Sequence, residues 1–597
     1  ETRIKIYTKD GYDWGNKAVR YYSAVNPTEK VTFSKAVTYN LVNGAIEKTK
    51  LKSDGEFDEQ ANKYWSVKKI AMPNVKEGSV IEYKYAIRSP YTSNFPLWSF
   101  QSTVPVNYSK FVTRIPEYYV YRTNVKGSVA LQRQETLQKR SYNYTTKDRY
   151  TNGRIVGTDF NSEKVEFNES ITTYIAEKVP SMKDEAYVSN ISNYTSSIEH
   201  ELSVLRFPNQ PIKSLSTTWD DVVKNIYEST DFGGEIKKNG YFEDDLKTIT
   251  AGLTSNDAKM MAIYLFVKNR MNWNNYYGYN CDGGVKKAYK DKVGNVAEIN
   301  LMLIAMLRAA GIDANPILVS TRDNGIPFFP NRTAYNYVIC AVEVQDAVIM
   351  LDATDKQALP NILPIRALNW IGRIIRPNGS SAEMNLMPHF NSKDVVNIIG
   401  SLDSSGKVSG KLRDQYFDYN AFLYRRNYAG VAKESYLEKL EKRLEGIEIG
   451  EYNSTMDDFS KPVVENFSFT HNRVSEIIGD KMYFAPLLFL TSKENPFKQE
   501  KREYPVDFIF PKQDKYTITM TIPDGFAVES LPAPAAVSMG DLGKFTFNIS
   551  SAGKQIQVAV SVDINESIVS SEDYQMLKDF YKSIIDKENE KIVLKKI

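Results

Sequence analysis

The chain has 597 residues, of which 42% are hydrophobic and 12% aromatic; this composition can supply about three or four packed domains and excludes a disordered chain. Lys and Arg together number 76, against 73 for Asp and Glu, and no long basic run occurs, so charge gives no reason to expect nucleic acid as a partner. Only two cysteines and three histidines are present, which excludes a disulfide framework and a cysteine-rich metal site. We therefore expect neither a metal nor a cofactor.

The sequence also carries signals of cellular location. No apolar run approaches the roughly 20 residues that cross a bilayer, so we do not expect an integral membrane protein. The chain begins at Glu1 with the strand-like pattern TRIKIYT, which suits an exported protein whose signal peptide has been removed, although a trimmed boundary would look the same. Low cysteine content and many Asn, Ser, Thr and Tyr residues favour the periplasm or the outer-membrane and cell surface.

Residues 1–185 show the pattern of a β-rich domain. Hydrophobic and polar residues alternate in TRIKIYT, VIEYKYAIR, KFVTRIP and KVEFNES, and turn residues separate these runs. In KEGSVIEYKYAIRSP a Glu-Gly turn is followed by Val80, Glu82 and Lys84, which alternate with an isoleucine and two tyrosines. This period of two predicts a β-sandwich-like N-terminal domain.

Within residues 186–395 the period changes to that of helices. TTWDDVVKNIYEST has Thr217 or Thr218 as its N-cap, and TSNDAKMMAIYLFVKNRMNW has Ser255 or Asn256. The next stretch, GNVAEINLMLIAMLRAAGIDANPIL, begins with a Gly-Asn turn and continues as an apolar helix that is too short to cross a membrane. The runs NPILVST, YNYVICAVEV and AVIMLDAT then predict antiparallel strands, so we expect an α+β domain.

Strand patterns return in residues 396–597. NIIGSLDSSGKVSGKLRDQ predicts a hairpin around Ser-Ser-Gly, and KYTITMTIPDGFAVES and QIQVAVSVDIN alternate as strands do. The segment SEDYQMLKDFYKSIIDKENEKIVL predicts an amphipathic helix at about residues 571–590, because Leu577, Phe580 and Ile584 fall on one face. We expect a β-sandwich-like C-terminal domain with a terminal helix.

Residues 255–356 resemble the transglutaminase-like fold, a branch of the papain-like thiol enzymes. The resemblance rests on the helix entry Gly294-Asn295, the run MLIAMLRAAGI, the two strands that follow and the sequence LDAT. The flanks agree, since the β-rich N-terminal part resembles an uncharacterised domain that precedes transglutaminase-like domains in bacterial envelope proteins. The tail, with IPDGFAVESLPAP and DYQMLKDFYKSII, resembles the β-rich domain that follows them. The resemblance covers nearly the whole chain and implies an α+β multidomain protein with a papain-like core between two β-rich domains.

The resemblance implies a Cys-His-Asp triad, with a cysteine thiolate at the start of the central helix and the histidine and aspartate on successive strands. Position by position, this chain has Val296 in place of the cysteine, Tyr337 in place of the histidine, and Asp352 as the aspartate. Valine has no nucleophilic atom, and tyrosine, with a pKa of about 10, is a poor general base at neutral pH. We therefore expect no catalytic residue, and we predict that Asp352 accepts a hydrogen bond from the Tyr337 hydroxyl.

Cys281, in the Gly-rich loop YYGYNCDGGVKK, is the remaining candidate nucleophile near this site. No histidine lies within residues 255–356, so a Cys281-centred active site is an alternative that has no local base. Cys340 alternates with the apolar residues of VICAVEV and is predicted to be a buried small side chain. A disulfide between the two cysteines remains open, and a zinc site is not expected because the ligands do not cluster.

A cleft beside these positions is the candidate binding site. The stretch MNWNNYYGYN either packs a loop against the central helix or lines the cleft for a peptide or a glycan. Arg322, in STRDNGIPFFP, either binds a carboxylate from the opposite wall or pairs with a neighbouring acid such as Asp323 or Glu298. The candidate cleft residues are Trp273, Tyr276, Tyr277, Cys281, Asn295, Arg322 and Asn336.

Together, the residues and the resemblance favour a non-catalytic envelope protein. We expect a binding or scaffolding module whose partners are polypeptides, other envelope proteins or cell-wall material. One alternative is an active thiol transglutaminase or amidase/protease that uses Cys281 or a group supplied by a partner. A second alternative is a glycan- or peptidoglycan-binding module.

Overall fold

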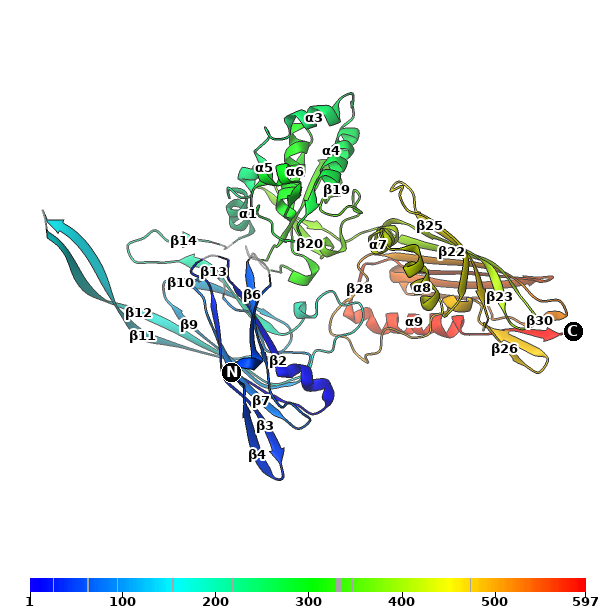
Figure 1. The fold of residues 1–597 in the computed structure, drawn as a ribbon, viewed down its shortest axis with the longest axis horizontal. Coiled ribbons are helices and arrows are strands. Elements are labelled where there is room, and N and C mark those ends of the chain that lie inside the picture. The colour runs from blue at the N-terminus through cyan, green and yellow to red at the C-terminus, as the bar shows by residue number, and fades with distance from the viewer. Residues whose placement is uncertain are drawn as a thin grey trace. The chain divides into compact units, whose positions relative to one another are not determined.

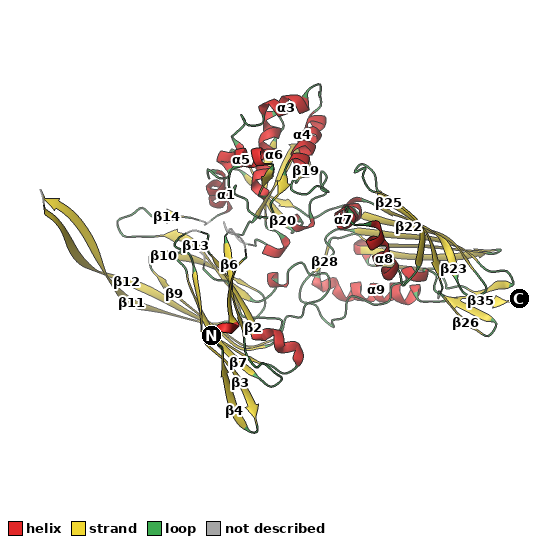
Figure 2. Ribbon diagram, viewed as in Figure 1, coloured by secondary structure: helices red, strands yellow, loops and turns green. Residues whose placement is uncertain are grey.

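The computed structural model describes residues 1–24, 26–61, 64–93, 95–152, 155–215, 218–328, 334–345, 347–472 and 474–597. The chain forms two compact units, Glu1–Pro96 and Leu97–Ile597. Strands dominate the N-terminal and C-terminal thirds of the sequence, and a group of helices lies in the middle third (Figure 1, Figure 2). The candidate N-cap Thr217 lies outside the described residues.

The first unit contains two antiparallel sheets packed as a small β-sandwich. Its strands are β1 (Thr2–Lys5), β2 (Asn16–Tyr22), β3 (Lys30–Val42), β4 (Ala45–Lys50), β5 (Glu56–Gln60), β6 (Trp65–Ala71) and β7 (Val80–Arg88). One sheet has the order β1-β7-β3-β4 and the other β2-β6-β5. Ile70 of β6 meets Ile81 and Tyr83 of β7 in one hydrophobic cluster, so the alternation in VIEYKYAIR is the alternation of buried and more exposed side chains.

The second unit begins with two further antiparallel sheets. Their strands are β8 (Trp98–Ser99), β9 (Val106–Pro116), β10 (Tyr119–Lys126), β11 (Gln132–Asn152), β12 (Ile155–Val179), β13 (Ser197–Leu205) and β14 (Lys213–Ser214). One sheet has the order β11-β12-β9, and β10, β13, β14 and β8 form the other. Phe111, Tyr174 and His200, whose ring centroids lie 5.7–6.3 Å apart, pack the two sheets together. Beyond β9, β11 and β12 continue as a long two-stranded hairpin (Figure 1).

The central part of the chain has the predicted α+β arrangement. Its helices are α1 (Trp219–Tyr227), α2 (Gly233–Ile236), α3 (Glu243–Thr250), α4 (Asn256–Arg270), α5 (Val285–Asp291) and α6 (Val296–Ala309). Its strands are β15 (Asn272–Trp273), β16 (Val293–Gly294), β17 (Ala314–Val319), β18 (Tyr337–Val344), β19 (Ala347–Leu351), β20 (Ile371–Ile375) and β21 (Ser381–Asn385). The main sheet is antiparallel with the order β19-β18-β17-β20-β21, and α6 packs on β17 and β18.

Local sequence explains where the helices of this part begin. Thr218 and Ser255 are the N-caps of α1 and α4, and each side chain accepts a hydrogen bond from the backbone three residues later. Asn295 and Glu298 form a reciprocal capping box at the start of α6. Every residue from Val296 to Leu307 is buried, which explains why α6 is apolar on all sides.

The C-terminal part is a large β-rich domain. Its strands are β22 (Ser392–Leu402), β23 (Val408–Tyr416), β24 (Glu448–Thr455), β25 (Val463–His471), β26 (Ser475–Ile478), β27 (Lys481–Phe484), β28 (Val506–Asp507), β29 (Lys512–Thr521), β30 (Phe526–Ser530), β31 (Ala535–Ser538), β32 (Gly543–Ala552), β33 (Gln555–Ile564), β34 (Ile568–Val569) and β35 (Ile592–Lys596). Its helices are α7 (Asp418–Tyr428), α8 (Lys433–Arg443) and α9 (Tyr574–Glu588).

The longest sheet of this domain has the order β24-β25-β23-β22-β29-β33-β32-β31 and is antiparallel except for the pair β22 and β29. The predicted hairpin around Ser-Ser-Gly is the turn between β22 and β23. The predicted terminal helix is α9, which buries Leu577, Phe580 and Ile584. Within the part of the chain that the structure describes, we find no helix with the length and hydropathy of a membrane span.

A buried ion pair connects the segment after β12 to the C-terminal domain. Glu185 lies 2.9 Å from Arg502, and the two side chains are 6% and 0% exposed. Glu185 also accepts hydrogen bonds from the backbone N–H groups of Lys498 and Gln499, at 2.7 and 2.9 Å, and from the Tyr574 hydroxyl at 3.0 Å. Burial by itself raises the pKa of Glu185, but these donors and Arg502 outweigh it and lower the pKa.

Replacing Glu185 with glutamine is expected to lower the free energy of unfolding by about 3 kcal/mol at pH 7, because Arg502 would remain buried without its counter-charge. A carboxylate with a lowered pKa stabilises the fold above the pKa of the unfolded chain, and this contribution is lost as pH falls through the folded pKa. The difference between wild type and Glu185→Gln should therefore shrink below about pH 4. Urea titrations at pH 7 and at pH 3.5 measure both effects.

Glu494→Gln is the matched control, because Glu494 forms an ion pair with Lys498 in which both side chains are largely exposed. This control should cost less than about 1 kcal/mol. Equal stability of wild type and Glu185→Gln at pH 7 would contradict the importance of the buried pair.

Candidate functional site

Val296 is the first residue of α6 and is fully buried. Its backbone N–H points to the carbonyl oxygen of Tyr276 at 3.4 Å, and Asn295 before it caps the helix. The side chain of Val296 is an isopropyl group. Where the resemblance places a thiol, the helix therefore presents no atom that ionises or attacks a carbonyl.

Tyr337 is the first residue of β18 and has no exposed surface. Its hydroxyl donates to Asp352 Oδ2 at 2.7 Å, which confirms the predicted hydrogen bond, and accepts from Arg366 Nε at 3.0 Å. Burial and then the negative charge of Asp352 raise the pKa of Tyr337 well above its ordinary value. The phenol therefore stays protonated at neutral pH and offers no general base.

Asp352 follows β19 and is also fully buried. Its Oδ1 atom accepts hydrogen bonds from Asn300 Nδ2 at 3.1 Å and from the backbone N–H and hydroxyl of Thr354 at 2.9 and 2.7 Å. With the Tyr337 hydroxyl on Oδ2, both carboxylate oxygens are satisfied. Asn300 belongs to α6 and also donates to the carbonyl of Val338, so Asp352 fastens the start of β18 to the central helix.

Arg366 completes this group, which we call the Tyr337 network: Asn300, Tyr337, Asp352, Thr354 and Arg366. Its guanidinium donates to Thr354 Oγ1 at 2.7 Å and lies 3.6 Å from Asp355. The centre of the guanidinium is 4.3 Å from the centroid of the Trp273 ring, a cation–π distance. Arg366 was missed in the sequence, where a single arginine in the apolar run LPIRALNW is the one available signal.

The predicted aromatic stretch lies beside this network. The Trp273 indole N–H donates to the carbonyl of Tyr276 at 3.1 Å, which holds the loop closed. Tyr277 lies between two rings, with its centroid 5.5 Å from Trp273 and 5.9 Å from Tyr337. Tyr277 is 42% exposed, so the structure places it at the surface above the buried Tyr337 ring.

The two asparagines of the candidate cleft bind backbone groups. Asn295 caps α6 through its side-chain oxygen and donates through Nδ2 to the carbonyl of Asn280 at 2.9 Å. Asn336 accepts a hydrogen bond from the backbone N–H of Thr321 and donates to its hydroxyl, both at 2.8 Å. Their side-chain amides therefore shape the two loops on either side of α6 and β18.

Arg322 is used for contact with the C-terminal domain. It forms an ion pair of 2.9 Å with Asp507 and donates to the carbonyl of Leu368 at 2.8 Å. The interpretation that Arg322 pairs with an acid of the protein is thus confirmed, but the acid is Asp507, and the two suggested partners, Asp323 and Glu298, are wrong. Asp507 comes from β28 and has a side chain that is 1% exposed, so its buried carboxylate requires a nearby cation.

Cys281 is partly exposed but lies in acidic surroundings. Burial, followed by the negative charges of Glu298 and Glu235, raises the pKa of its thiol far above the ordinary value. Glu298 Oε1 accepts hydrogen bonds from the backbone N–H groups of residues 282, 283 and 284, at 3.1, 2.6 and 3.0 Å. A carboxylate thus occupies the helix start that would stabilise a thiolate. Cys340 is buried, and neither cysteine forms a disulfide.

No histidine takes part in the hydrogen bonds of the Tyr337 network among the described residues. His200 lies among the aromatic rings of the N-terminal sheets, and burial lowers its pKa to about 4. Among the residues that the structure describes, no group of three or more His, Cys, Asp and Glu side chains is placed to hold a metal ion. The arrangement supplies a closed hydrogen-bonded network, with one aromatic ring exposed above it.

Comparison with known families divides the chain into three regions. Residues 246–351 match the transglutaminase-like superfamily. Residues 1–150 match DUF3857 and residues 480–594 match DUF3858, each a domain of unknown function with a solved structure. No functionally curated protein matches the sequence.

Two solved structures are similar to the chain. A candidate protease from Parabacteroides distasonis ATCC 8503 is 12% identical, aligns over 99% of this chain and 94% of that chain, and has a TM-score of 0.55, which shows a shared fold. A candidate cysteine protease from Cytophaga hutchinsonii is 12% identical and aligns over 43% of this chain and 79% of that chain, with a TM-score of 0.16.

Tyr337→Phe is expected to lower the free energy of unfolding by about 1–3 kcal/mol, because Asp352 Oδ2 loses its hydroxyl donor and Arg366 loses an acceptor inside the protein. Chemical denaturation measures the change. Tyr277→Phe is the control and should change stability by less than about 0.5 kcal/mol, since this ring is partly exposed. An unchanged stability in Tyr337→Phe would mean that the network contributes nothing to the fold.

Cys281 is expected to react with iodoacetamide at pH 7.5 at least tenfold more slowly than free cysteine, because only the thiolate attacks and the pKa of this thiol is raised. The rate should continue to rise with pH beyond pH 9. Mass spectrometry of a Cys340→Ser variant isolates the Cys281 adduct. A rate at pH 7.5 that equals or exceeds that of free cysteine would mean that this thiol is activated.

Proposed function

We propose, from the premise that this chain carries a transglutaminase-like domain flanked by two domains of unknown function, that the protein is a non-catalytic binding module for polypeptide partners in the cell envelope. The observation that carries this proposal is the Tyr337 network. It replaces the proton-transfer apparatus of a thiol enzyme with a buried, satisfied set of hydrogen bonds.

The chemistry that remains supports the absence of turnover. Removing the nucleophile from a measured serine triad lowers the rate by roughly 10⁶-fold, and this chain lacks both nucleophile and base at the matching positions. Recruiting Cys281 would require a proton acceptor, yet the charged groups that act on its thiol are mainly carboxylates, which disfavour the thiolate. A partner would have to supply a base and also offset these charges.

The hairpin of β11 and β12 supports binding of a polypeptide. β9 pairs with β12 only from Glu169 onward, so the outer part of the hairpin is a two-stranded ribbon within the described residues. The outer edge of β11 therefore presents unpaired backbone N–H and C=O groups, to which an extended peptide can add as a further strand. Tyr142 and Phe160 on this ribbon are 64% and 62% exposed, and Leu137 of β11, just before the ribbon begins, is 73% exposed.

These three side chains lie on both faces of the hairpin. Leu137 and Phe160 share one face, because Phe160 pairs with Lys147 and residues 137 and 147 are an even number of positions apart. Tyr142 lies on the other face and stacks on Tyr144 at 6.5 Å between centroids. An added strand would thus find aromatic and aliphatic contacts on each side of its backbone.

The first test is for turnover. The purified chain is expected to incorporate no dansylcadaverine into dimethylcasein and to cleave no peptide library, and Cys281→Ser should behave as wild type does. Turnover above background that disappears in Cys281→Ser would overturn the non-catalytic proposal in favour of a thiol enzyme.

The second test is for partners. Cross-linking in envelope extracts, followed by mass spectrometry, should yield the same polypeptide partners with wild type and with Ile399→Glu, a control at a side chain that is 71% exposed in the C-terminal domain. The triple variant Leu137→Glu/Tyr142→Glu/Phe160→Glu should lose at least tenfold of that yield, because added charge on both faces disfavours strand addition. Equal capture by the triple variant would exclude the ribbon as the binding surface.

A further inference from the structure

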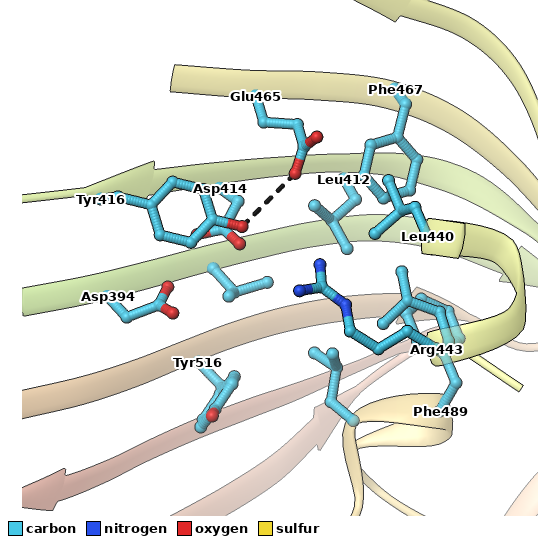
Figure 3. A pocket seen from close by; sticks show the side chains of 13 residues that line it. Asp394, Leu412, Asp414, Tyr416, Leu440, Arg443, Glu465, Phe467, Phe489 and Tyr516 are labelled. Atoms are coloured by element: carbon cyan, nitrogen blue, oxygen red, sulfur yellow. Dashed lines mark hydrogen bonds between the residues drawn. The ribbon is translucent and has the colours of Figure 1, made fainter. Parts of the chain in front are cut away.

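A cavity of about 290 Å³ lies in the C-terminal domain, between the sheet and helix α8 (Figure 3). Its size is close to the roughly 300 Å³ at which small-ligand sites begin, and it has room for about ten water molecules. It belongs to a different domain from the Tyr337 network. The lining residues are Asp394, Val396, Leu412, Asp414, Tyr416, Leu440, Arg443, Leu444, Glu465, Phe467, Phe489, Leu490 and Tyr516.

One end of the cavity is acidic because four neighbouring strands place carboxyl groups side by side. Asp394 of β22 is opposite Asp514 of β29, and Asp414 of β23 is opposite Glu465 of β25. Like charges directly opposite one another destabilise a sheet, so this arrangement has an energetic cost when the carboxyl groups are ionised. A positively charged group or a bound proton in the cavity would offset it.

The four carboxyl groups differ in how many hydrogen bonds they already accept from the protein, and therefore in how readily they can bind a ligand. Glu465 is already surrounded by phenols, with Oε1 accepting from Tyr436 at 2.6 Å and Tyr452 at 2.8 Å. By contrast, Oδ1 of Asp394 and Oδ1 of Asp414 are buried and accept no hydrogen bond from a donor in the described chain. Asp414 is 8% exposed and lines the cavity. Its carboxyl group and that of Asp394 contact each other, which requires them to share a proton when no cationic ligand is bound between them.

The opposite wall of the cavity contributes one positively charged side chain. Arg443, the last residue of α8, extends its guanidinium towards the carboxyl groups on the strands (Figure 3). It forms neither a hydrogen bond nor an ion pair within 4 Å with any described residue. The cavity therefore holds two adjacent carboxyl groups on the sheet and a guanidinium on the helix, and the guanidinium forms no ion pair with either carboxyl group.

The remaining wall is apolar. Leu412, Leu440, Phe467 and Phe489 lie together at the side of the cavity away from Asp394 (Figure 3). Their contact with water is unfavourable, so a ligand that covers them gains hydrophobic stabilisation. An organic ammonium suits the carboxyl pair, because it can donate a hydrogen bond to each carboxyl group while its apolar part covers these side chains.

We propose that this cavity binds a free α-amino acid with an apolar side chain. Its ammonium group would bind Asp394 and Asp414, its carboxylate would bind Arg443 in a bidentate fork, and its side chain would cover the leucines and phenylalanines. Opposite unpaired charges on facing walls favour a zwitterion over a simple amine or a simple acid. The site is independent of the polypeptide-binding surface proposed above.

Proton release accompanies this binding. Burial and then Asp414 raise the pKa of Asp394 to about 10, so the carboxyl pair of the empty cavity holds a proton at neutral pH. The ligand's ammonium group would displace it, and affinity should rise with pH by up to about tenfold per unit between pH 6 and 8. The other titratable groups that face the pair are Tyr416 on β23, Arg443 on α8, Glu465 on β25, and Asp514 and Tyr516 on β29.

Isothermal titration calorimetry of the full chain with L-leucine tests the proposal. Leucine should bind with the release of about one proton, detected as a dependence of the heat on the ionisation enthalpy of the buffer. 3-Methylbutylamine, which lacks the carboxylate, and 4-methylpentanoate, which lacks the ammonium, should each bind at least tenfold more weakly. Absence of binding by leucine and by phenylalanine at millimolar concentration would overturn the proposal.

Single substitutions test the contributions of the carboxyl groups and of the guanidinium to binding one at a time. Asp414→Asn and Arg443→Met should each weaken leucine binding at least tenfold, and Arg443→Met should leave the affinity for 3-methylbutylamine nearly unchanged. Arg426→Met, at an exposed arginine of α7, is the control and should bind leucine as wild type does. Leucine binding that is unaffected by Arg443→Met would overturn the zwitterion assignment, even if Asp414→Asn fails to fold.

Discussion

The buried start of α6 is the constraint on which the central domain depends. A helix that is enclosed by protein must satisfy its first N–H groups from within the chain, and here Asn295 and Glu298 do so. Glu298 also accepts hydrogen bonds from the backbone N–H groups of residues 282–284, and these bonds fix the loop that carries Cys281. The Glu298 carboxylate thus caps the start of α6, fixes the backbone of the neighbouring loop and places a negative charge near the Cys281 thiol.

The same constraint explains the Tyr337 network. Asp352 is fully buried, and a buried carboxylate is tolerated only when donors surround it. Asn300 from the helix, Thr354 from the following turn and the Tyr337 hydroxyl provide those donors, and Arg366 adds positive charge. Tyrosine at this position gives the aspartate a donor, as a histidine would, but its raised pKa makes it useless as a proton acceptor.

The two polar sites of the molecule differ in how far they are satisfied. In the Tyr337 network each carboxylate oxygen has a donor, and Val296 is packed without exposure. In the C-terminal cavity an acidic pair and a guanidinium face one another without forming an ion pair. Satisfied buried groups stabilise a fold, whereas unsatisfied groups around an open volume are the usual signature of a ligand site. We therefore propose that the Tyr337 network stabilises the fold and that the C-terminal cavity binds a ligand.

Much of the architecture could be predicted from local patterns. Features that depend on neighbouring residues are visible in the sequence: the period of two in VIEYKYAIR, the Ser-Ser-Gly turn and the apolar face of α9. The two helix caps were narrowed to two adjacent residues each, of which the structure selects Thr218 and Ser255. The resemblance to the transglutaminase-like fold singled out Val296, Tyr337 and Asp352, which periodicity and spacing by themselves do not identify.

The sequence by itself determined the element types, and its resemblance to the transglutaminase-like fold drew attention to Val296, Tyr337 and Asp352. Only the tertiary structure decided which distant groups meet. Arg366 approaches Tyr337 through a loop that returns after β19, and Arg322 finds Asp507 across 185 positions. Asp394 and Asp514 become neighbours because β22 and β29 pair in parallel across a long connection. Charge and hydrogen bonding select such partners by distance in space, and local periodicity carries no information about that distance.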